Sequence, residues 1–308
     1  MCIKTSEIAI IILNYNTPYL TIKNVDIIIE NNKDVIIAIV DNNSMDSSYS
    51  ILSKYYTETK NVHVIQSPKN GGYSYGNNFG CRYILELYED IKFIAIMNPD
   101  VQCREVGLLY KLAHELQEDK LLAVLAPVMI QDELLVTYKI GWKCDSLSSC
   151  ILKKSIVASK FLKKRNAYDK YEMNHRHNII YCDVVQGSLF MIKRDVFESV
   201  GFFDEKVFLY YEEAILAHKL KKLGYREGTL LTNTYIHEHT LERQTLKKRR
   251  KTIRQDFQSE MYYCKEYLKI GIVSRGILKV LNLYYICVEM LVAEYLYIAK
   301  KWYKIKRM

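Results

Sequence analysis

Short apolar runs alternate with segments of mixed polarity along the first hundred residues. Four runs rich in β-branched residues, at 8–13, 35–40, 62–66 and 93–97, predict buried strands. The segments between them, at about 18–31, 47–56 and from the glycine pair at 71–72 to 88, are predicted helices. Strands that alternate with helices in this way predict an α/β fold with a single doubly wound, mostly parallel sheet.

The pattern continues beyond residue 100 with less regularity. Further strands are expected at 121–126, 182–192 and 230–236, and short helices at 193–199 and from 212 to about 223, where Gly224 ends the pattern. Gly187 falls inside the second of these strands, which indicates a bulge or a close approach of another group to the backbone. Residues 131–181 are expected to form loops and short elements that cover a pocket.

Polar residues follow each of the first four strands. In open α/β sheets, ligands bind outside the carboxyl ends of the strands, so these polar groups are expected to form one rim of one pocket. The residues concerned are Asn14 and Asn16, Asp41 and Asn43, Asn70 with Gly71 and Gly72, and Asn98 with Asp100.

Charge divides the chain at about residue 240. Residues 241–308 hold 16 Lys and Arg against 6 Asp and Glu, a net charge of +10 in a chain whose total is +9. The stretch 272–298 is apolar but contains four charged residues, so it is expected to lie on a membrane as a basic amphipathic helix rather than to span it. A solvated face without a partner is the alternative, and nucleic-acid binding lacks a recognised motif.

Cysteine usage and the amino terminus bear on the compartment. None of the eight cysteines forms a C-x-x-C pair, which argues against a zinc site or a disulfide framework and favours reduced cytosolic thiols. The first apolar run has only six residues, so no signal peptide is expected.

Five segments in this order give a resemblance to a known family: IILNYN, VDNNS, KNGGYSYGNNFG, MNPDV and GSLFMIKRDVFESVGFFDEKVFLYYEE. Together they resemble family 2 glycosyltransferases with the A-type nucleotide-sugar fold, and are most similar to the rhamnosyltransferase-like branch that builds bacterial surface polysaccharides. The resemblance covers about residues 8–240. It implies a nucleotide-sugar-binding catalytic domain at 1–240, and the charge and residue pattern of 241–308 predict a basic amphipathic helical tail after it.

Asp100 is the predicted metal contact. A divalent cation held by a carboxylate neutralises the charge that develops on a leaving diphosphate, and Mg²⁺ or Mn²⁺ prefers oxygen ligands. The family usually presents two aspartates separated by one residue, and here Asn98 stands in the first place, so the cation would bind largely through the diphosphate. His237 resembles the histidine that completes this shell, and His239 is its rival two residues along.

The nucleotide would lie against the first three strand ends. Asp41 can accept hydrogen bonds from a ribose or from the base N–H of uracil or thymine, although a helix N-cap is the alternative. Gly71 and Gly72 would let the backbone come near the ligand, or simply form a strand–helix turn. Asn77 would cap the following helix or contact the sugar.

Glu212 and Glu213 are the candidate bases. An acceptor hydroxyl must lose its proton as it attacks the sugar, and a positioned carboxylate can take it. The resemblance maps the base to Glu213, where the family usually has aspartate, and leaves Glu212 as the other candidate. Gly187 and Tyr211 are predicted on the sugar or acceptor side. Helix-dipole stabilisation is the alternative for two glutamates at a helix start.

These features together predict a metal-dependent glycosyltransferase, and the resemblance to the family implies that the transfer inverts the sugar configuration. It would move a sugar from a UDP- or dTDP-sugar to a lipid-linked oligosaccharide, as a peripheral protein at the cytoplasmic face of the plasma membrane, in capsule or exopolysaccharide synthesis. A nucleotidyltransferase would need a basic glycine-rich loop after the first strand, where Asn14 stands instead. A catalytically degenerate partner subunit of a polysaccharide synthase is the remaining alternative.

Overall fold

The computed structural model describes residues 3–131, 134–135, 140–154, 172–238 and 246–305. The chain forms two compact units. The α/β unit comprises Met1–Cys144, Asn166–Phe208 and Glu212–Thr240, and the helical unit comprises Asp145–Arg165, Leu209–Tyr211 and Leu241–Met308. His239, the rival metal ligand, lies outside the described residues.

One sheet runs through the α/β unit. Within the described ranges it has eleven strands in the order β3-β2-β1-β4-β10-β6-β11-β9-β8, with β5 beside β11 and β7 beside β6. The four strands β3, β2, β1 and β4 are parallel, whereas β10 is antiparallel to both of its neighbours. The strands are β1 Ile8–Asn14, β2 Ile36–Asp41, β3 Val62–Gln66, β4 Phe93–Met97, β5 Val101–Gln102, β6 Leu122–Gln131, β7 Leu134–Leu135, β8 Met173–Asn174, β9 Ile179–Cys182, β10 Leu189–Lys193 and β11 Arg226–His237.

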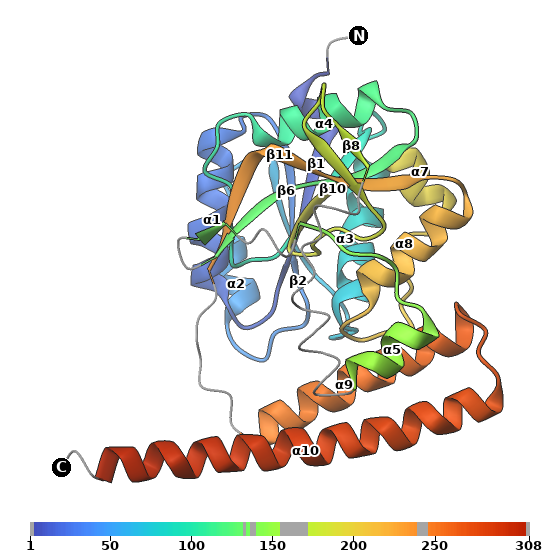
Figure 1. Ribbon diagram of the computed structural model, residues 1–308. Helices are drawn as coiled ribbons and strands as arrows, with labels where there is room; N and C mark the ends of the chain where they lie inside the picture. Colours follow the sequence, from blue (N-terminus) through green and yellow to red (C-terminus); the bar gives the residue numbers. More distant parts are fainter. Residues whose placement is uncertain (1–2, 132–133, 136–139, 155–171, 239–245, 306–308) are drawn as a thin grey trace. The chain divides into compact units, whose positions relative to one another are not determined.

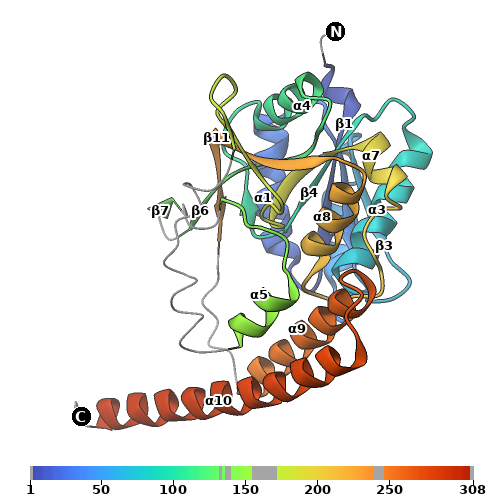
Figure 2. The same cartoon turned by 45° about the vertical axis from the view of Figure 1, so that its right-hand side comes forward.

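Helices cover both faces of the sheet, as Figures 1 and 2 show. Alternate residues of β1 enter opposite cores: Ile10 packs with α1, α2 and α4, and Ile11 packs with α3, α7 and α8. Both cores are closed to solvent, which is why the strands read as continuous apolar runs. The helices are α1 Pro18–Asn31, α2 Ser48–Tyr55, α3 Tyr73–Leu87, α4 Leu108–Glu118, α7 Arg194–Ser199 and α8 Glu212–Lys222, with a 3-10 turn η1 at Thr5–Glu7.

The predicted α/β fold with a mostly parallel sheet is confirmed, and β3 and β4 have the predicted bounds. The single strand expected at 182–192 is wrong. Cys182 ends β9, which pairs with β11, whereas Leu189 begins β10, which pairs with β4. The chain must therefore cross between two different partners, and Gly187 lies in that connection rather than inside a strand.

The helical unit consists of α5 Leu147–Lys153, α9 Leu246–Glu266 and α10 Ile272–Ile305, with α9 and α10 side by side in Figures 1 and 2. Its interior contains the buried Tyr263, whose hydroxyl donates to the carbonyl oxygen of Asp145 at 3.1 Å. Cys150 and Cys264 face each other as free thiols with their sulfurs 3.7 Å apart. Across the helices that the structure describes, none combines the length and the hydropathy needed to cross a membrane.

Candidate functional site

The carboxyl ends of β2, β1 and β4 lie side by side at one edge of the sheet. Asn14 and Asp41 are direct neighbours across β1 and β2, and Ile12 pairs with Met97, the last residue of β4. The polar residues that follow these strands therefore share one edge, as their sequence positions predict.

Asp41 is fully buried and ties three strand ends together. Its Oδ1 accepts hydrogen bonds from Asn14 Nδ2 at 2.9 Å and from Ser44 Oγ at 2.6 Å. Its Oδ2 accepts from the Ser44 amide at 3.0 Å and from Gln66 Nε2 at 3.2 Å. The carboxylate thus fixes the shape of the rim, and its direct contact with a ribose or base stays a prediction.

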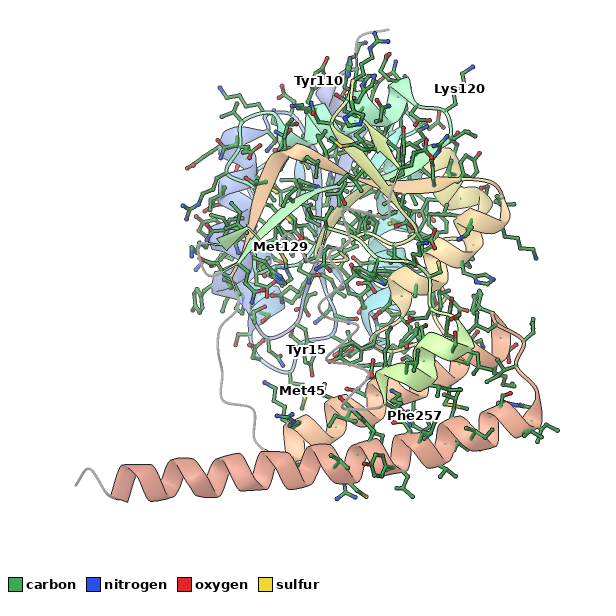
Figure 3. All side chains as sticks on the ribbon, viewed as in Figure 1. Tyr15, Met45, Tyr110, Lys120, Met129 and Phe257 are labelled. Atoms are coloured by element: carbon green, nitrogen blue, oxygen red, sulfur yellow. The ribbon has the colours of Figure 1, made fainter. Side chains whose placement is uncertain are left out.

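Asn16 and Asn43 occupy left-handed backbone positions beyond β1 and β2, with φ of 57° and 55°. Asparagine tolerates this conformation better than most residues. Asn16 Oδ1 accepts from the Met45 amide at 2.9 Å, and Asn43 Nδ2 donates to the Pro68 carbonyl at 2.9 Å. Figure 3 shows Tyr15 and Met45 at the same end of the α/β unit. These contacts join the loops after β1, β2 and β3 into one rim.

The glycine turn after β3 is required by a neighbouring backbone. Gly72 has a φ of +89°, and a Cβ there would overlap the carbonyl of Phe208. The Tyr73 amide donates to that same carbonyl at 2.9 Å. A Cβ at Gly71 would overlap the Tyr75 ring. The glycine turn therefore contacts the backbone of Phe208, four residues before Glu212. The predicted contact of Gly71 and Gly72 with a ligand stays a prediction.

Two asparagines at this turn are buried or bonded internally. Asn70 Oδ1 accepts from the Gly72 amide and from Asn42 Nδ2, each at 3.2 Å. Asn77 is buried, and its Nδ2 donates to the Tyr73 carbonyl at 3.0 Å within α3. Asn42, which the sequence reading passed over, links the end of β2 to the glycine turn because it also donates to the Gly72 carbonyl.

The Asn98-Pro99-Asp100 segment forms a tight turn after β4. The Val101 amide donates to the Asn98 carbonyl at 3.2 Å, and Asn24 Nδ2 donates to the Pro99 carbonyl at 2.6 Å. The Asn98 amide donates to the carbonyl of Ser188 at 2.9 Å. Backbone contacts on both sides therefore hold the turn that carries Asp100.

Asp100 and His237 lie together, as predicted for a metal site. Asp100 Oδ1 is 3.2 Å from His237 Nε2, and the Glu238 amide donates to the Asp100 carbonyl at 2.8 Å. Within the described part of the chain no group of three or more His, Cys, Asp or Glu could hold a metal ion. One carboxylate and one imidazole fit a divalent cation that takes its remaining ligands from substrate oxygens and water, and the oxygen of Asp100 is the ligand of the pair that Mg²⁺ or Mn²⁺ prefers.

Glu212 and Glu213 begin α8, and Glu213 reaches the connection before β10. A Cβ at Gly187 would overlap Glu213 Oε1, so the carboxylate lies directly against the Gly187 backbone. Tyr73 Oη donates to the Gly187 carbonyl at 2.9 Å. Glu212 is buried, whereas Glu213 keeps part of its surface open to solvent. This geometry favours Glu213 as the group available to a substrate.

Burial raises the pKa of Glu213 above its ordinary value of 4.5. Dense protein around a carboxyl group disfavours its charged form, which makes the carboxylate a stronger base once it has lost its proton. The same surroundings raise the pKa of the Tyr73 hydroxyl, with the two glutamates adding to the effect of burial. Tyr73 therefore remains a hydrogen-bond donor beside the base.

A short path of contacts connects the two halves of the site. Glu213 packs on Gly187, Gly187 is followed by Ser188, and the Ser188 carbonyl receives the Asn98 amide two residues before Asp100. The structure thus brings the predicted base and the predicted metal ligand to one place, at the edge that also holds Asp41.

Tyr211 has a contact that the sequence did not indicate. It belongs to the helical unit, where its hydroxyl donates to Glu260 Oε1 at 3.2 Å. Tyr210 and Tyr211 both have left-handed backbones, with φ of 72° and 68°. For residues with a Cβ this conformation costs about 1–2 kcal/mol each. The predicted place of Tyr211 on the acceptor side stays a prediction.

Sequence reasoning missed several residues that shape the site. Ser44 could have been found from its place three residues after Asp41, a spacing at which an aspartate side chain bonds the backbone of a turn. Asn42, Tyr73 and Ser188 carried no such signal, because their contacts join residues 30 to 114 positions apart or depend on strand pairing.

Two surface cavities lie away from this edge. One of about 500 Å³ is lined by Lys92, Lys120 and Lys193 among others, and one of about 300 Å³ by Glu115 and His177 among others. The first adjoins the start of β4, which is the opposite end of the parallel strands. Neither cavity contains the predicted site residues.

Comparison with known sequences finds a family match. The model of the family described as Glycosyl transferase family 2 matches residues 9–201, more than half of the chain. A curated relative, the low-salt glycan biosynthesis hexosyltransferase Agl10 of Haloferax volcanii, is 23% identical over 236 residues, which cover 77% of this chain and 68% of the relative.

Solved structures share the fold at low sequence identity. A mannosyltransferase from Pyrobaculum calidifontis in complex with GDP-Man and Mn²⁺ has a TM-score of 0.58 at 15% identity, over 93% of this chain and 74% of its own. GalNAc-T7 with UDP, GalNAc and Mn²⁺ has a TM-score of 0.62 at 14% identity, over 84% of this chain and 48% of its own.

Adding a methyl group at residue 187 should displace the carboxylate of Glu213, the predicted base, from its observed position. In Gly187→Ala the new Cβ would overlap Glu213 Oε1, so the carboxylate must move. We expect turnover to fall at least about tenfold, since small misplacements of a catalytic group are costly. Turnover measured with saturating substrates, beside the melting temperature, checks this.

Gly276→Ala is the matched control for that variant. Nothing lies within 4 Å of a Cβ at this position in α10, and alanine is favoured over glycine in a helix by about 0.5–1 kcal/mol. The control should keep its turnover. Equal turnover in the two variants would contradict the contact between Glu213 and Gly187.

Proposed function

Because the chain belongs to glycosyl transferase family 2 and is a glycosyltransferase, we propose that Glu213 is the base and Asp100 the metal contact of an inverting sugar transfer. The observation that carries this proposal is the path from Glu213 through Gly187 and Ser188 to the turn of Asp100. Inversion of the sugar configuration follows from the resemblance to the family.

A nucleotide-sugar donor would lie along the ends of β2, β1 and β4. Structural neighbours were solved with GDP-Man or with UDP and GalNAc, which supports a donor of this class. We propose a UDP- or dTDP-sugar that carries a hexose, a deoxyhexose or an N-acetylhexosamine. Asn14, Asp41 and Asn43 would shape the side that receives the nucleotide.

A divalent cation, Mg²⁺ or Mn²⁺, is proposed at Asp100 and His237. When bound, it would stabilise the negative charge of the leaving diphosphate. The side chains of Asp100 and His237 are 29% and 10% exposed, so Asp100 is the more accessible of the two. The presence of Mn²⁺ in both structural neighbours supports a cation of this kind.

Glu213 would take the proton of the acceptor hydroxyl as that oxygen attacks the sugar. Its raised pKa and its partial exposure suit this task, whereas the buried Glu212 is less accessible. The alternative, a degenerate partner subunit that binds a donor without transferring it, predicts donor binding with no turnover.

We further propose that the acceptor is a lipid-linked oligosaccharide and that the helical unit lies on the cytoplasmic face of the plasma membrane. This unit holds 22 Lys and Arg against 7 Asp and Glu, a net charge of +15, whereas the α/β unit holds 22 against 28, or −6. Attraction to anionic lipid contributes about 1 kcal/mol for each basic residue near the surface.

One face of α10 supports that proposal. Val273, Ile277, Val280 and Tyr284 follow a spacing of three and four residues, which places them on one side of the helix. Their exposed fractions are 77%, 48%, 70% and 57%. Leu278, on the opposite side, is fully buried. An apolar stripe in a strongly basic unit fits the headgroup region of an anionic membrane.

Removing the carboxylate of Glu213 should abolish transfer while donor binding remains. For Glu213→Gln we expect turnover to fall by about 10²–10⁴, since the amide keeps the shape but accepts no proton. Sugar transfer with a panel of UDP- and dTDP-sugars, and thermal stabilisation by the same donors, check both parts. Glu86→Gln, an exposed residue of α3, is the control. Wild-type protein that binds donors without turnover would favour the partner subunit.

Chelation should stop transfer, and added Mn²⁺ or Mg²⁺ should restore it. In Asp100→Asn the concentration of Mn²⁺ that restores half of the activity should rise at least about tenfold, because a neutral amide is the weaker ligand for a hard cation. Titration of activity against Mn²⁺ measures this, with the exposed Asp90→Asn as the control. Full activity in EDTA would exclude the proposed cation.

Polar substitutions on the apolar stripe should weaken membrane binding. For the double variant Ile277→Asn and Val280→Asn we expect at least about tenfold less binding to vesicles rich in phosphatidylglycerol, because two exposed apolar anchors are lost. Vesicle sedimentation measures this, and Leu121→Asn, which replaces an exposed leucine of the α/β unit, is the control. Equal binding by both variants would place the membrane contact elsewhere.

A further inference from the structure

The segment that leads into Glu212 and Glu213 passes through both units. Phe208 belongs to the α/β unit, where its carbonyl accepts the Tyr73 amide at 2.9 Å. The next three residues, Leu209–Tyr211, belong to the helical unit, and the chain returns to the α/β unit at Glu212. The two candidate bases therefore follow directly after residues that the helical unit holds.

Two successive residues of α9 hold this segment. Ser259 Oγ donates to the Leu209 carbonyl at 2.7 Å, and the Tyr211 hydroxyl donates to Glu260 Oε1 at 3.2 Å. The ring of Tyr211 packs against that of Tyr263, one turn further along α9, with centroids 5.4 Å apart. The segment is thus fastened by a backbone contact and by a side-chain contact.

Glu260 is itself held firmly. Its side chain is 1% exposed, and its Oε2 lies 2.9 Å from Lys154 Nζ beyond α5 and 3.1 Å from Asn282 Nδ2 of α10. Burial raises the pKa of the Tyr211 hydroxyl, so this group stays protonated and donates to Glu260. One carboxylate therefore joins α5, α9 and α10 to the residue before Glu212.

The backbone of Leu209–Tyr211 has an unfavourable conformation that contacts of this kind stabilise. Tyr210 and Tyr211 both lie in the left-handed region, which residues with a Cβ seldom adopt. Strained conformations of this kind persist only where the surroundings determine them, and they gather at functional sites. Without the contacts of Ser259 and Glu260, the segment would be expected to relax just before Glu212.

We propose that Ser259 and Glu260 are positioning residues for the catalytic carboxylates, because they hold Leu209–Tyr211, the segment with two left-handed residues that leads directly into Glu212 and Glu213. The inference rests on the proposed function, since it takes Glu213 as the base. It gives Ser259 and Glu260 of α9 a part in the chemical step through the three residues that precede Glu212.

Ser259→Ala provides the sharpest test, because it removes one hydroxyl that no proposed ligand contacts. We expect kcat to fall about tenfold with the KM for the donor changed less than about twofold, since the donor residues follow β1, β2 and β4. Ser259→Thr keeps a hydroxyl and should restore most of the loss. Tyr211→Phe should resemble Ser259→Ala. Gln258→Ala, at the exposed neighbouring position of α9, should match the wild type.

Hydrogen exchange tests the same inference without enzyme activity. Amide exchange over residues 209–216 should be at least about tenfold faster in Ser259→Ala than in Gln258→Ala, at equal melting temperature. Unchanged exchange, or unchanged kcat in an active enzyme, would overturn the positioning role. Faster exchange in a protein whose wild type transfers no sugar would instead leave the fastening intact and reject the proposed function.

Discussion

The antiparallel pairing of β10 with β4 is the constraint on which the site depends. Because β10 runs against β4, its first residues lie beside the last residues of β4. The hydrogen bond from the Asn98 amide to the Ser188 carbonyl extends that pairing by one step into the turn of Asp100. A parallel β10 would start at the opposite edge of the sheet, and Gly187 with the Glu213 side chain that packs on it would be far from Asp100.

Three carboxylates at this edge differ because their surroundings differ. Asp41 is closed off from solvent and accepts four hydrogen bonds from the loops around it, which makes it a structural tie. Asp100 is partly exposed beside a histidine and suits a cation. Glu213 is packed against glycine backbone with its pKa raised by burial. The same functional group thus differs in accessibility and in proton affinity through burial and partners.

The two units carry opposite net charges, and the chain passes between them on both sides of Leu209–Tyr211. The α/β unit is negative and the helical unit strongly positive, a difference that favours anionic partners at the helical unit. The strained tyrosines stand where the chain changes units.

The sequence by itself determined the first four strands, their order along the chain and the polar residues at their ends, because buried parallel strands need apolar β-branched runs. It also singled out Asp100, His237 and Glu213, which the fold brings to one edge. It did not reveal that residues 182–192 contain the end of one strand and the start of another. Nor did it reveal that the Phe208 carbonyl leaves no room for a Cβ at residue 72, or that Tyr211 bonds to Glu260 of α9. Those features arise from contacts between residues distant along the chain, and local patterns of hydrophobicity carry no information about which distant backbone a residue will meet.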